Sequence, residues 1–220
     1  MKKHYLIIAI AIMSMALMSC SFSFDGESFG GKTIKGDGHV VTRNYDVTAF
    51  NDISASLPAT INFTIGDDYH CTVRVDENIL EYLEIKAKGN ELLLGKTKEG
   101  KNVNLRATEF VIDITAPSLG LINLAGSGKF NVRSALNVKK LEVNLAGSGD
   151  VFFKEPVTVN EINLNVAGSG ALKCNELVAD GLYGNIAGSG ELKVLQGLSR
   201  KPRRVWQALV TAIWLATLTI

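Results

Sequence analysis

The sequence has few of the residues that usually carry catalysis or bind metals. It contains three histidines, and because His4 lies in an N-terminal apolar segment, only His39 and His70 remain as candidates. Asp67 and Asp68 stand close to His70, but a Gly-Asp-Asp stretch between two apolar segments is typical of a solvated turn. No Ser-His-Asp set can be named, and no carboxylate pair stands out among the 22 acidic residues. We therefore expect a protein that is not an enzyme, with no catalytic residues, no metal site and no cofactor.

An excess of basic charge is also lacking. The formal net charge of +1 for the 220-residue chain depends on its two ends. Residues 1–19 hold two of the 23 basic residues, residues 196–220 hold four, and neither range holds an acid. The rest of the chain carries 17 basic and 22 acidic residues, a net charge of −5. Nucleic-acid binding needs a basic face, so nucleic acid is not an expected partner.

Cysteines are few as well, and two of the three lie among strand-like segments. Cys71 and Cys174 both occupy apolar positions of alternating segments, where a thiol behaves as a small hydrophobic group. We expect two buried free thiols. A disulfide is the alternative if the protein lies in an oxidising compartment.

The first residues have the organisation of a secretory signal. Lys2 and Lys3 precede an apolar run over residues 6–17 that is too short to span a bilayer. Ser19 then stands immediately before Cys20, and the segment resembles the lipobox of bacterial lipoproteins. The resemblance implies cleavage after residue 19, lipid on Cys20 and the membrane as a partner; a plain secretory signal is the alternative. Residues 20–38 are rich in Ser, Gly and Asp and predict a flexible tether.

One motif, Ala-Gly-Ser-Gly, dominates the second half of the chain. Its alanines are residues 125, 146, 167 and 187, and a fixed period in this range is typical of stacked segments. Apolar residues alternate with polar ones on both sides of each motif, as in half-buried strands, and Gly-Ser-Gly suits a tight bend. We predict an all-β, single-domain parallel β-solenoid over residues 39–195, with about 21 residues per coil. The motifs occupy residues 120–195, and the crossover rule favours a right-handed sense.

Two polar positions recur with the motif. They are the asparagines Asn123, Asn144, Asn165 and Asn185 and the serines Ser127, Ser148, Ser169 and Ser189. In stacked coils each set would form a row with steps of about 4.8 Å. The structural interpretation is that the side-chain amides satisfy one another. The functional interpretation is a flat polar face for an extended glycan or peptide, and these eight residues are our candidate binding face. The residue after each motif varies too much to indicate a calcium or phosphate site.

The first half of the chain carries strand signals without the motif. Two hairpins are predicted, one over residues 61–75 and one over residues 85–94. A short helical turn after Asp76 and a strand over residues 110–115, before Pro117, are also expected. We expect this half to cap the solenoid or to form its less regular first coils.

Three stretches carry a resemblance to a known family. They are Asp76-Glu-Asn-Ile-Leu-Glu-Tyr-Leu83, Ile112-Asp-Ile-Thr-Ala-Pro-Ser-Leu119 and the serial Ala-Gly-Ser-Gly motifs. Together they resemble the bacterial family described as putative auto-transporter adhesins with a head GIN domain, common in Bacteroidetes lipoproteins, over about residues 40–195. The resemblance implies a β-solenoid on an envelope-attached protein and transfers no functional residues.

Residues 196–220 break the alternating pattern. Four basic residues precede an apolar run that holds both tryptophans and is short for a membrane span. The codons of Trp206 and Gln207 force an alanine codon in the reading frame that straddles them, and the neighbouring codons permit Val-Ala-Gly-Ser-Gly there. This lies about one motif period after Ala187. Our hypothesis is that this tail is translated out of frame.

These observations favour a non-catalytic lipoprotein of the cell envelope, anchored in the outer membrane. It would act as an adhesin or binding module that presents the asparagine and serine rows to a glycan or to an envelope or matrix protein. A carbohydrate-active enzyme on a β-helix is one alternative, and it would need a cleft with clustered charged residues. A structural stalk or assembly unit that self-associates through the solenoid ends is the other.

Overall fold

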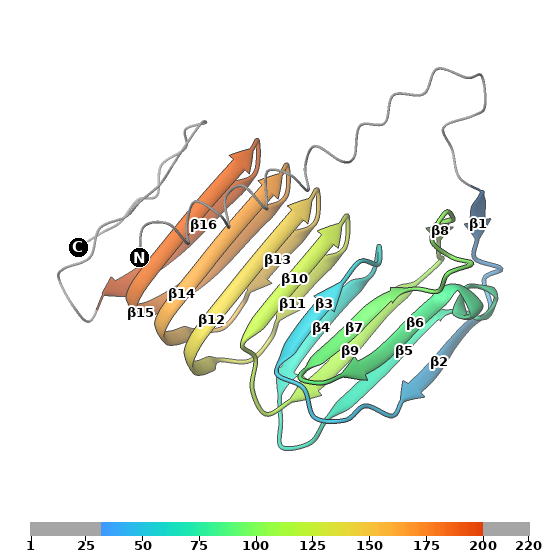
Figure 1. The fold of residues 1–220 in the computed structure, drawn as a ribbon, viewed down its shortest axis with the longest axis horizontal. Coiled ribbons are helices and arrows are strands. Elements are labelled where there is room, and N and C mark those ends of the chain that lie inside the picture. Colours follow the sequence, from blue (N-terminus) through green and yellow to red (C-terminus); the bar gives the residue numbers. More distant parts are fainter. Residues whose placement is uncertain (1–31, 200–220) are drawn as a thin grey trace. The chain divides into compact units, whose positions relative to one another are not determined.

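The computed structural model of the chain describes residues 32–199 (Figure 1). The strands are β1 (Thr33–Lys35), β2 (Val40–Tyr45), β3 (Asp52–Ala55), β4 (Thr60–Ile65), β5 (His70–Asp76), β6 (Leu83–Lys88), β7 (Glu91–Lys96), β8 (Asn104–Arg106), β9 (Phe110–Ala116), β10 (Leu121–Gly126), β11 (Lys129–Val132), β12 (Leu136–Gly147), β13 (Asp150–Phe153), β14 (Val157–Gly168), β15 (Ala171–Gly188) and β16 (Glu191–Ser199). The predicted helical turn is present as a 3-10 helix, η1 (Glu77–Tyr82). The predicted signal and the lipidation site Cys20 lie outside the described residues, and so does the tail predicted over residues 196–220 except for its first four residues.

Fourteen strands form one continuous sheet in the order β2-β5-β9-β4-β11-β13-β15-β14-β12-β10-β3-β7-β6, with β16 on β15. The long strand β15 pairs with both β13 and β14, so the sheet turns back on itself and its two sides face a common core. β1 and β8 form a separate two-stranded parallel sheet.

The prediction of a parallel β-solenoid is wrong, although the all-β class is confirmed. The sheet is mixed, because β2 with β5, β5 with β9 and β6 with β7 pair antiparallel. These strands continue the same sheet as the motif-bearing strands and curl it into a nearly closed, barrel-like wall, instead of capping a stack of uniform parallel coils. A two-residue turn at Gly89-Asn90 joins β6 to β7 and leaves no room for a crossover, whereas the antiparallel pairs of β5 with β2 and β9 join strands that lie far apart in the chain.

One of the two predicted hairpins is also wrong. β6 and β7 pair around Gly89-Asn90 as expected. β4 and β5, by contrast, do not pair, because β9 lies between them, parallel to β4 and antiparallel to β5. Two strand spacings amount to about 10 Å, and the four residues from Gly66 to Tyr69 can span about 13 Å when extended. The turn is therefore long enough to straddle a strand.

The four Ala-Gly-Ser-Gly motifs lie beside one another in the sheet. The parallel registers of β10, β12, β14 and β15 bring Gly126, Gly147, Gly168 and Gly188 into one row. All four have a positive φ, between 93° and 122°, which glycine adopts without the penalty of a Cβ atom. The glycines therefore make the bends at which the chain passes from one side of the sheet to the other.

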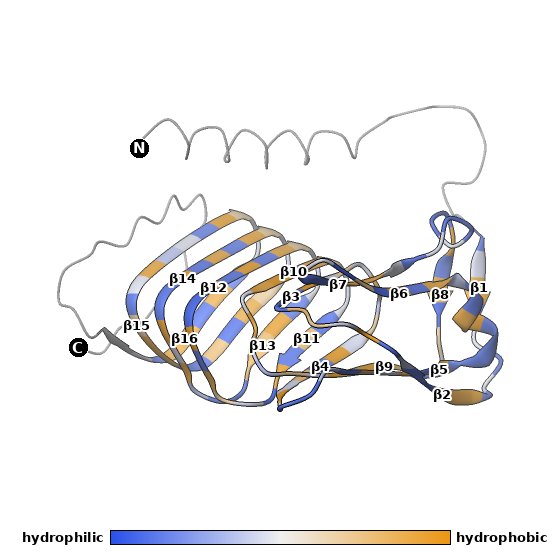
Figure 2. Cartoon of the chain, turned by 60° about the horizontal axis from the view of Figure 1, so that its bottom comes forward, coloured by the Kyte–Doolittle hydropathy of each residue, from blue (hydrophilic) through white to orange (hydrophobic). Residues whose placement is uncertain are grey.

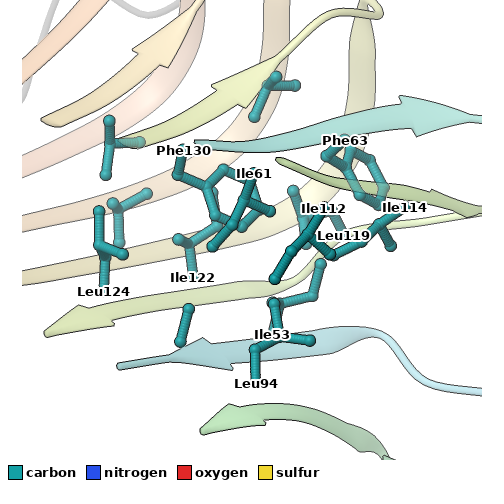
Figure 3. Packing of buried hydrophobic residues seen from close by; sticks show 14 of the residues in the cluster. Ile53, Ile61, Phe63, Leu94, Ile112, Ile114, Leu119, Ile122, Leu124 and Phe130 are labelled. Atoms are coloured by element: carbon teal, nitrogen blue, oxygen red, sulfur yellow. The ribbon is translucent and has the colours of Figure 1, made fainter. Parts of the chain in front are cut away.

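Apolar side chains from both sides of the sheet fill the interior. Apolar and polar residues alternate along the strands (Figure 2), as in the burial pattern of β9, where every second residue is buried. Ile53, Ile61, Ile112, Ile122 and Phe130 lie close together in the centre of this core (Figure 3). Each large apolar side chain buried in this way stabilises the fold by about 1.5–3 kcal/mol.

Two predicted segment boundaries shift. β1 lies inside the range 20–38 that we expected to be a tether, and it pairs with β8. β16 runs past residue 195 and continues its pairing with β15 as far as Ser199. The described β structure is thus longer at both ends than the predicted range of 39–195.

Candidate functional site

The four predicted asparagines form a hydrogen-bonded row across β10, β12, β14 and β15. The Nδ2 group of Asn144 donates to Oδ1 of Asn123 at 2.9 Å, and Asn165 and Asn185 donate to their preceding asparagines at 2.8 Å. At its other end the row continues to Ser54, whose Oγ accepts from Asn123 at 3.0 Å. The Ser54 hydroxyl in turn donates to the Glu91 carboxylate. The structural interpretation of the asparagines, mutual satisfaction of their amides, thus describes their contacts.

The row leaves part of each amide available to a ligand. An asparagine side chain has two N–H donors and an oxygen with two lone pairs. The row uses one donor and one lone pair, and Asn144 spends a further donor on Oε1 of Glu142 at 3.0 Å. Asn123, Asn144 and Asn165 are half-buried and Asn185 is exposed, so the outer edge of each amide reaches the surface.

Two further rows run beside the asparagines on the outside of the sheet. The serines are all exposed, and three of the four motif alanines are exposed while Ala167 is half-buried. We call these three rows the Asn–Ala–Ser face; it consists of Asn123, Asn144, Asn165, Asn185, Ala125, Ala146, Ala167, Ala187, Ser127, Ser148, Ser169 and Ser189. None of the twelve side chains is large or charged, and the strands repeat at about 4.8 Å. The twelve side chains of the face are therefore small, uncharged and regularly spaced.

Sequence reasoning missed a second amide row on the other side of the sheet. Nδ2 of Asn62 donates to Asp113 at 2.8 Å, and Nδ2 of Asn131 donates to Oδ1 of Asn62 at 3.2 Å. The same row meets Phe152 on β13 and Lys173 on β15, so its polar residues do not recur with the motif. No periodic signal could have found it, because β4, β9 and β11 become neighbours only in the folded sheet.

A buried carboxylate at the end of β5 fixes the loops that follow β1 and β8. Asp76 is 0% exposed and accepts hydrogen bonds from the backbone N–H groups of Gly38 at 2.8 Å and Thr108 at 2.7 Å. Burial alone would raise the pKa of Asp76, but these hydrogen bonds outweigh it and hold the pKa below its ordinary value. A Cβ atom on Gly36 would lie 2.3 Å from the carboxylate, so the loop needs glycine there. This site is structural.

The two thiols in the described part of the chain are free and buried, as predicted from their apolar positions. Burial raises the pKa of Cys71 and that of Cys174 to about 12. Such thiols are protonated at neutral pH and are poor nucleophiles or metal ligands.

Within residues 32–199 no group of three or more His, Cys, Asp or Glu side chains is placed to hold a metal ion. No helix in this range is long and apolar enough to cross a membrane. His39 contacts Glu77 at 3.1 Å on an exposed loop, in a pair separate from the Asn–Ala–Ser face.

Known structures share this fold. A crystal structure of a "putative lipid binding protein" from Parabacteroides distasonis is 29% identical, with a TM-score of 0.72 over 76% of this chain and 70% of that one. A "putative adhesin" from the same species is 29% identical, with a TM-score of 0.69 over 76% and 69% of the two chains. A "putative adhesin" from Bacteroides fragilis, at 21% identity and a TM-score of 0.54 over 80% and 94%, shares the fold alone. A comparison with functionally curated proteins finds no match.

A family model settles the membership. The model described as "Putative auto-transporter adhesin, head GIN domain" matches residues 49–200, which include all four Ala-Gly-Ser-Gly motifs and the Asn–Ala–Ser face. The family and the similar structures are described by binding or adhesion, and their descriptions name no catalytic activity. Membership of an adhesin family points to a protein of the cell envelope or surface. The chain belongs to the family described as "Putative auto-transporter adhesin, head GIN domain".

Proposed function

We propose that the protein is a non-catalytic binding module of the cell envelope and that its Asn–Ala–Ser face binds an extended polysaccharide. The observation that carries this proposal is the face itself, with its three parallel rows of small neutral residues. Amide groups and hydroxyls on a fixed spacing suit a ligand that presents hydroxyl groups at regular intervals. Weak contacts at each strand would add along the face, because sites linked on one rigid surface gain avidity.

A protein partner fits this face less well. Protein interfaces depend on a few large anchors, most often Trp, Tyr and Arg. The Asn–Ala–Ser face has none of them among its twelve residues. A lipid ligand, suggested by the description of one similar structure, would need exposed or enclosed apolar surface. Among the described residues the exposed large apolar side chains are Tyr183 and Leu195, both near the C-terminal edge of the sheet.

The test compares two arginine substitutions on the same strand. Ala146→Arg places a bulky cation in the centre of the face, where the alanine is exposed and a larger side chain can point to solvent. Asn137→Arg is the matched control, because Asn137 is also exposed on β12 but lies outside the face. A soluble form of the chain is screened on a glycan array and on insoluble polysaccharides. We expect at least tenfold weaker binding for Ala146→Arg, and binding for Asn137→Arg equal to that of the unsubstituted chain.

Two results would count against this function. If the chain binds no polysaccharide, the proposal of a glycan ligand is wrong. If Ala146→Arg and Asn137→Arg lose equal amounts of polysaccharide binding, the ligand does not bind at the face. Release of reducing ends during incubation would favour the carbohydrate-active enzyme instead. Self-association without any ligand would favour the stalk or assembly unit.

The proposal includes an anchor at the other end of the chain. Lipid on Cys20 would hold the module at the outer membrane, as the lipobox-like segment implies. Metabolic labelling with an alkyne fatty acid should mark the chain, and Cys20→Ser should abolish the label and release the protein from the membrane fraction. Cys71→Ser is the control, since that buried thiol should not affect labelling.

A further inference from the structure

The C-terminal edge of the sheet is an uncovered layer. β16 pairs with β15 on one side, and in the described part of the chain no strand lies on its other side. The second half of β15 likewise pairs only with β14. Leu182, Ile186, Leu192 and Val194 are only partly buried here, whereas the residues at the same positions one motif earlier are buried. We call this surface the terminal layer.

The β6 edge of the sheet is protected and this one is not. β6 ends the strand order with the charged residues Glu84, Lys86 and Lys88, and charge on an edge strand prevents pairing with another chain. The terminal layer instead exposes Tyr183 at 40% and Leu195 at 55% of their surface. An exposed apolar edge of this kind is a template for pairing with a further strand.

The terminal layer specifies what can cover it. A Cβ atom on Gly147, Gly168 or Gly188 would lie 2.3–2.6 Å from the carbonyl oxygen of the preceding bend, so each added bend must carry glycine. Each asparagine donates to the one before it, so Oδ1 of Asn185 is the acceptor to which a further residue of the row would donate. The covering segment therefore needs a glycine bend, inward apolar residues on both sides of it and a hydrogen-bond donor opposite Asn185.

The 220-residue chain does not supply this segment in its own reading frame. Residues 200–220 follow directly on β16 but contain no glycine and no asparagine. The shifted frame permits such a segment, and several of its residues depend on which synonymous codons are used. Codons for Val205, Trp206 and Gln207 force Leu, Val or Met followed by Ala, and the next codon encodes Ser or Gly.

Beyond the bend the agreement is partial, because the codons for Thr211 and Ala212 force Cys, Arg, Ser or Gly at the inward position that Phe130, Val151, Leu172 and Leu192 occupy in the four motifs. Codons for Ala208 and Leu209 permit Ser, those for Leu209 and Val210 permit Gly, and those for Val210 and Thr211 force Tyr, His, Asn or Asp. Codons for Ile213 and Trp214 force Leu or Met. That residue is the fourth after the second glycine of the motif. The same inward position is occupied by Val132, Phe153, Cys174 and Val194 in the four motifs. Opposite Asn185 the shifted frame permits Ser, the residue type that begins the row at Ser54.

We infer that the terminal layer is the docking surface for one further Ala-Gly-Ser-Gly segment, which the shifted reading frame encodes in place of residues from about 200 onward. The segment pairs parallel to the second half of β15, with its bend on Gly188. Its inward apolar residues cover Ile186 and Val194.

The first test is the coding DNA. We expect GCA followed by a glycine codon, a serine codon and a second glycine codon in the frame that straddles Trp206 and Gln207. A shifted frame that spells another residue at either glycine position overturns the inference.

The second test compares two proteins, the 220-residue chain and a chain in which the shifted frame replaces its tail. Hydrogen–deuterium exchange should slow at least tenfold at the amides of β16 in the replaced chain, while the amides of β10 serve as the unchanged control. Replacing the first glycine of the new bend by Val in the replaced chain should return the β16 amides to fast exchange. Equal exchange in both chains would refute the inference, and so would a replaced chain that is less soluble or melts at a lower temperature.

Discussion

Because the glycine bends stack on one another, two substitutions can separate the cost of backbone strain from the cost of contact with the neighbouring bend. Gly168→Ala adds a methyl group at φ +122°, where the new Cβ would lie 2.3 Å from the carbonyl oxygen of Gly147. Gly126→Ala is a matched control, because this glycine occupies the same place in its motif and has φ +93°, yet nothing lies within 4 Å of its Cβ position. Both substitutions pay for a positive φ, and only Gly168→Ala also meets the neighbouring bend.

The expected magnitudes follow from these contacts. A positive φ costs an alanine about 1–2 kcal/mol, and this cost is common to both variants. At Gly168 the carbonyl of Gly147 must also move, although it accepts hydrogen bonds from the N–H groups of Ser169 at 2.9 Å and Gly170 at 3.0 Å. Overpacking and a weakened pair of hydrogen bonds together cost about 2–4 kcal/mol more. Gly168→Ala should therefore lower the free energy of unfolding by about 3–6 kcal/mol and Gly126→Ala by about 1–2 kcal/mol.

Urea unfolding followed by circular dichroism measures the difference. With an m-value of about 2 kcal/mol per molar urea, the midpoint of Gly168→Ala should lie about 1–2 M below that of Gly126→Ala. The gain from a less flexible unfolded chain is the same for both glycine-to-alanine changes and cancels in the comparison. Midpoints that agree within about 0.2 M would refute direct contact between successive bends.

Three further predictions rest on single contacts. Asp76→Asn should lower the free energy of unfolding by about 1–3 kcal/mol at neutral pH. Because the folded pKa of Asp76 is lowered, the stability that its carboxylate contributes is present above about pH 4 and is lost as the pH falls through the folded pKa. The variant and the unsubstituted chain should therefore converge in acid-unfolding curves. Asn144→Ala should destabilise the fold by about 1–3 kcal/mol in thermal unfolding, since it leaves Asn123 and Asn165 without their shared partner. The same substitution should also weaken polysaccharide binding to the face. Cys71 and Cys174 should resist alkylation at pH 8 in the folded protein and react fully after unfolding, and rapid labelling of the folded chain at either thiol would show that the core opens there.

The neighbours within the motif region could be predicted from spacing alone. Asparagines one period apart were expected to form a row, and Asn123, Asn144 and Asn165 do pair side by side. Identical residues at a fixed period give each segment the same burial pattern, so parallel in-register pairing satisfies all of them at once. Burial of Cys174 followed from the same alternation.

The topology of the first half could not be predicted in this way. Alternating apolar residues identify β4, β5 and β9 as strands. The alternation does not depend on which strand is the neighbour or on whether the pairing is parallel or antiparallel. The insertion of β9 between β4 and β5 depends on contacts across some 50 residues, for example that between Asn62 and Asp113. Sequence patterns of period 2 carry no information about such partners, and the assumption of uniform parallel pairing failed at this point.

Asp76 shows a second limit. In the sequence it immediately precedes the predicted helical turn, but the structure shows no side-chain cap bond from it to η1. Its carboxylate instead binds the backbone of Gly38 and Thr108, two loops that are distant from it in the chain. A buried carboxylate with remote backbone donors has no local signature, because its partners are N–H groups that every residue type presents.

The Asn–Ala–Ser face combines positions whose residue type has a structural cause with positions where the fold tolerates other residues. The glycines are required by the closeness of successive bends, and the asparagines by the amide row. The alanines contribute little to the core, since Ala125, Ala146 and Ala187 are exposed. Small residues at all four alanine positions keep the surface flat, and flatness contributes nothing to the packing of the core. A property that repeats without a structural reason is the one that a ligand would require, and Ala146→Arg is therefore a sharper probe of function than any change to the asparagines.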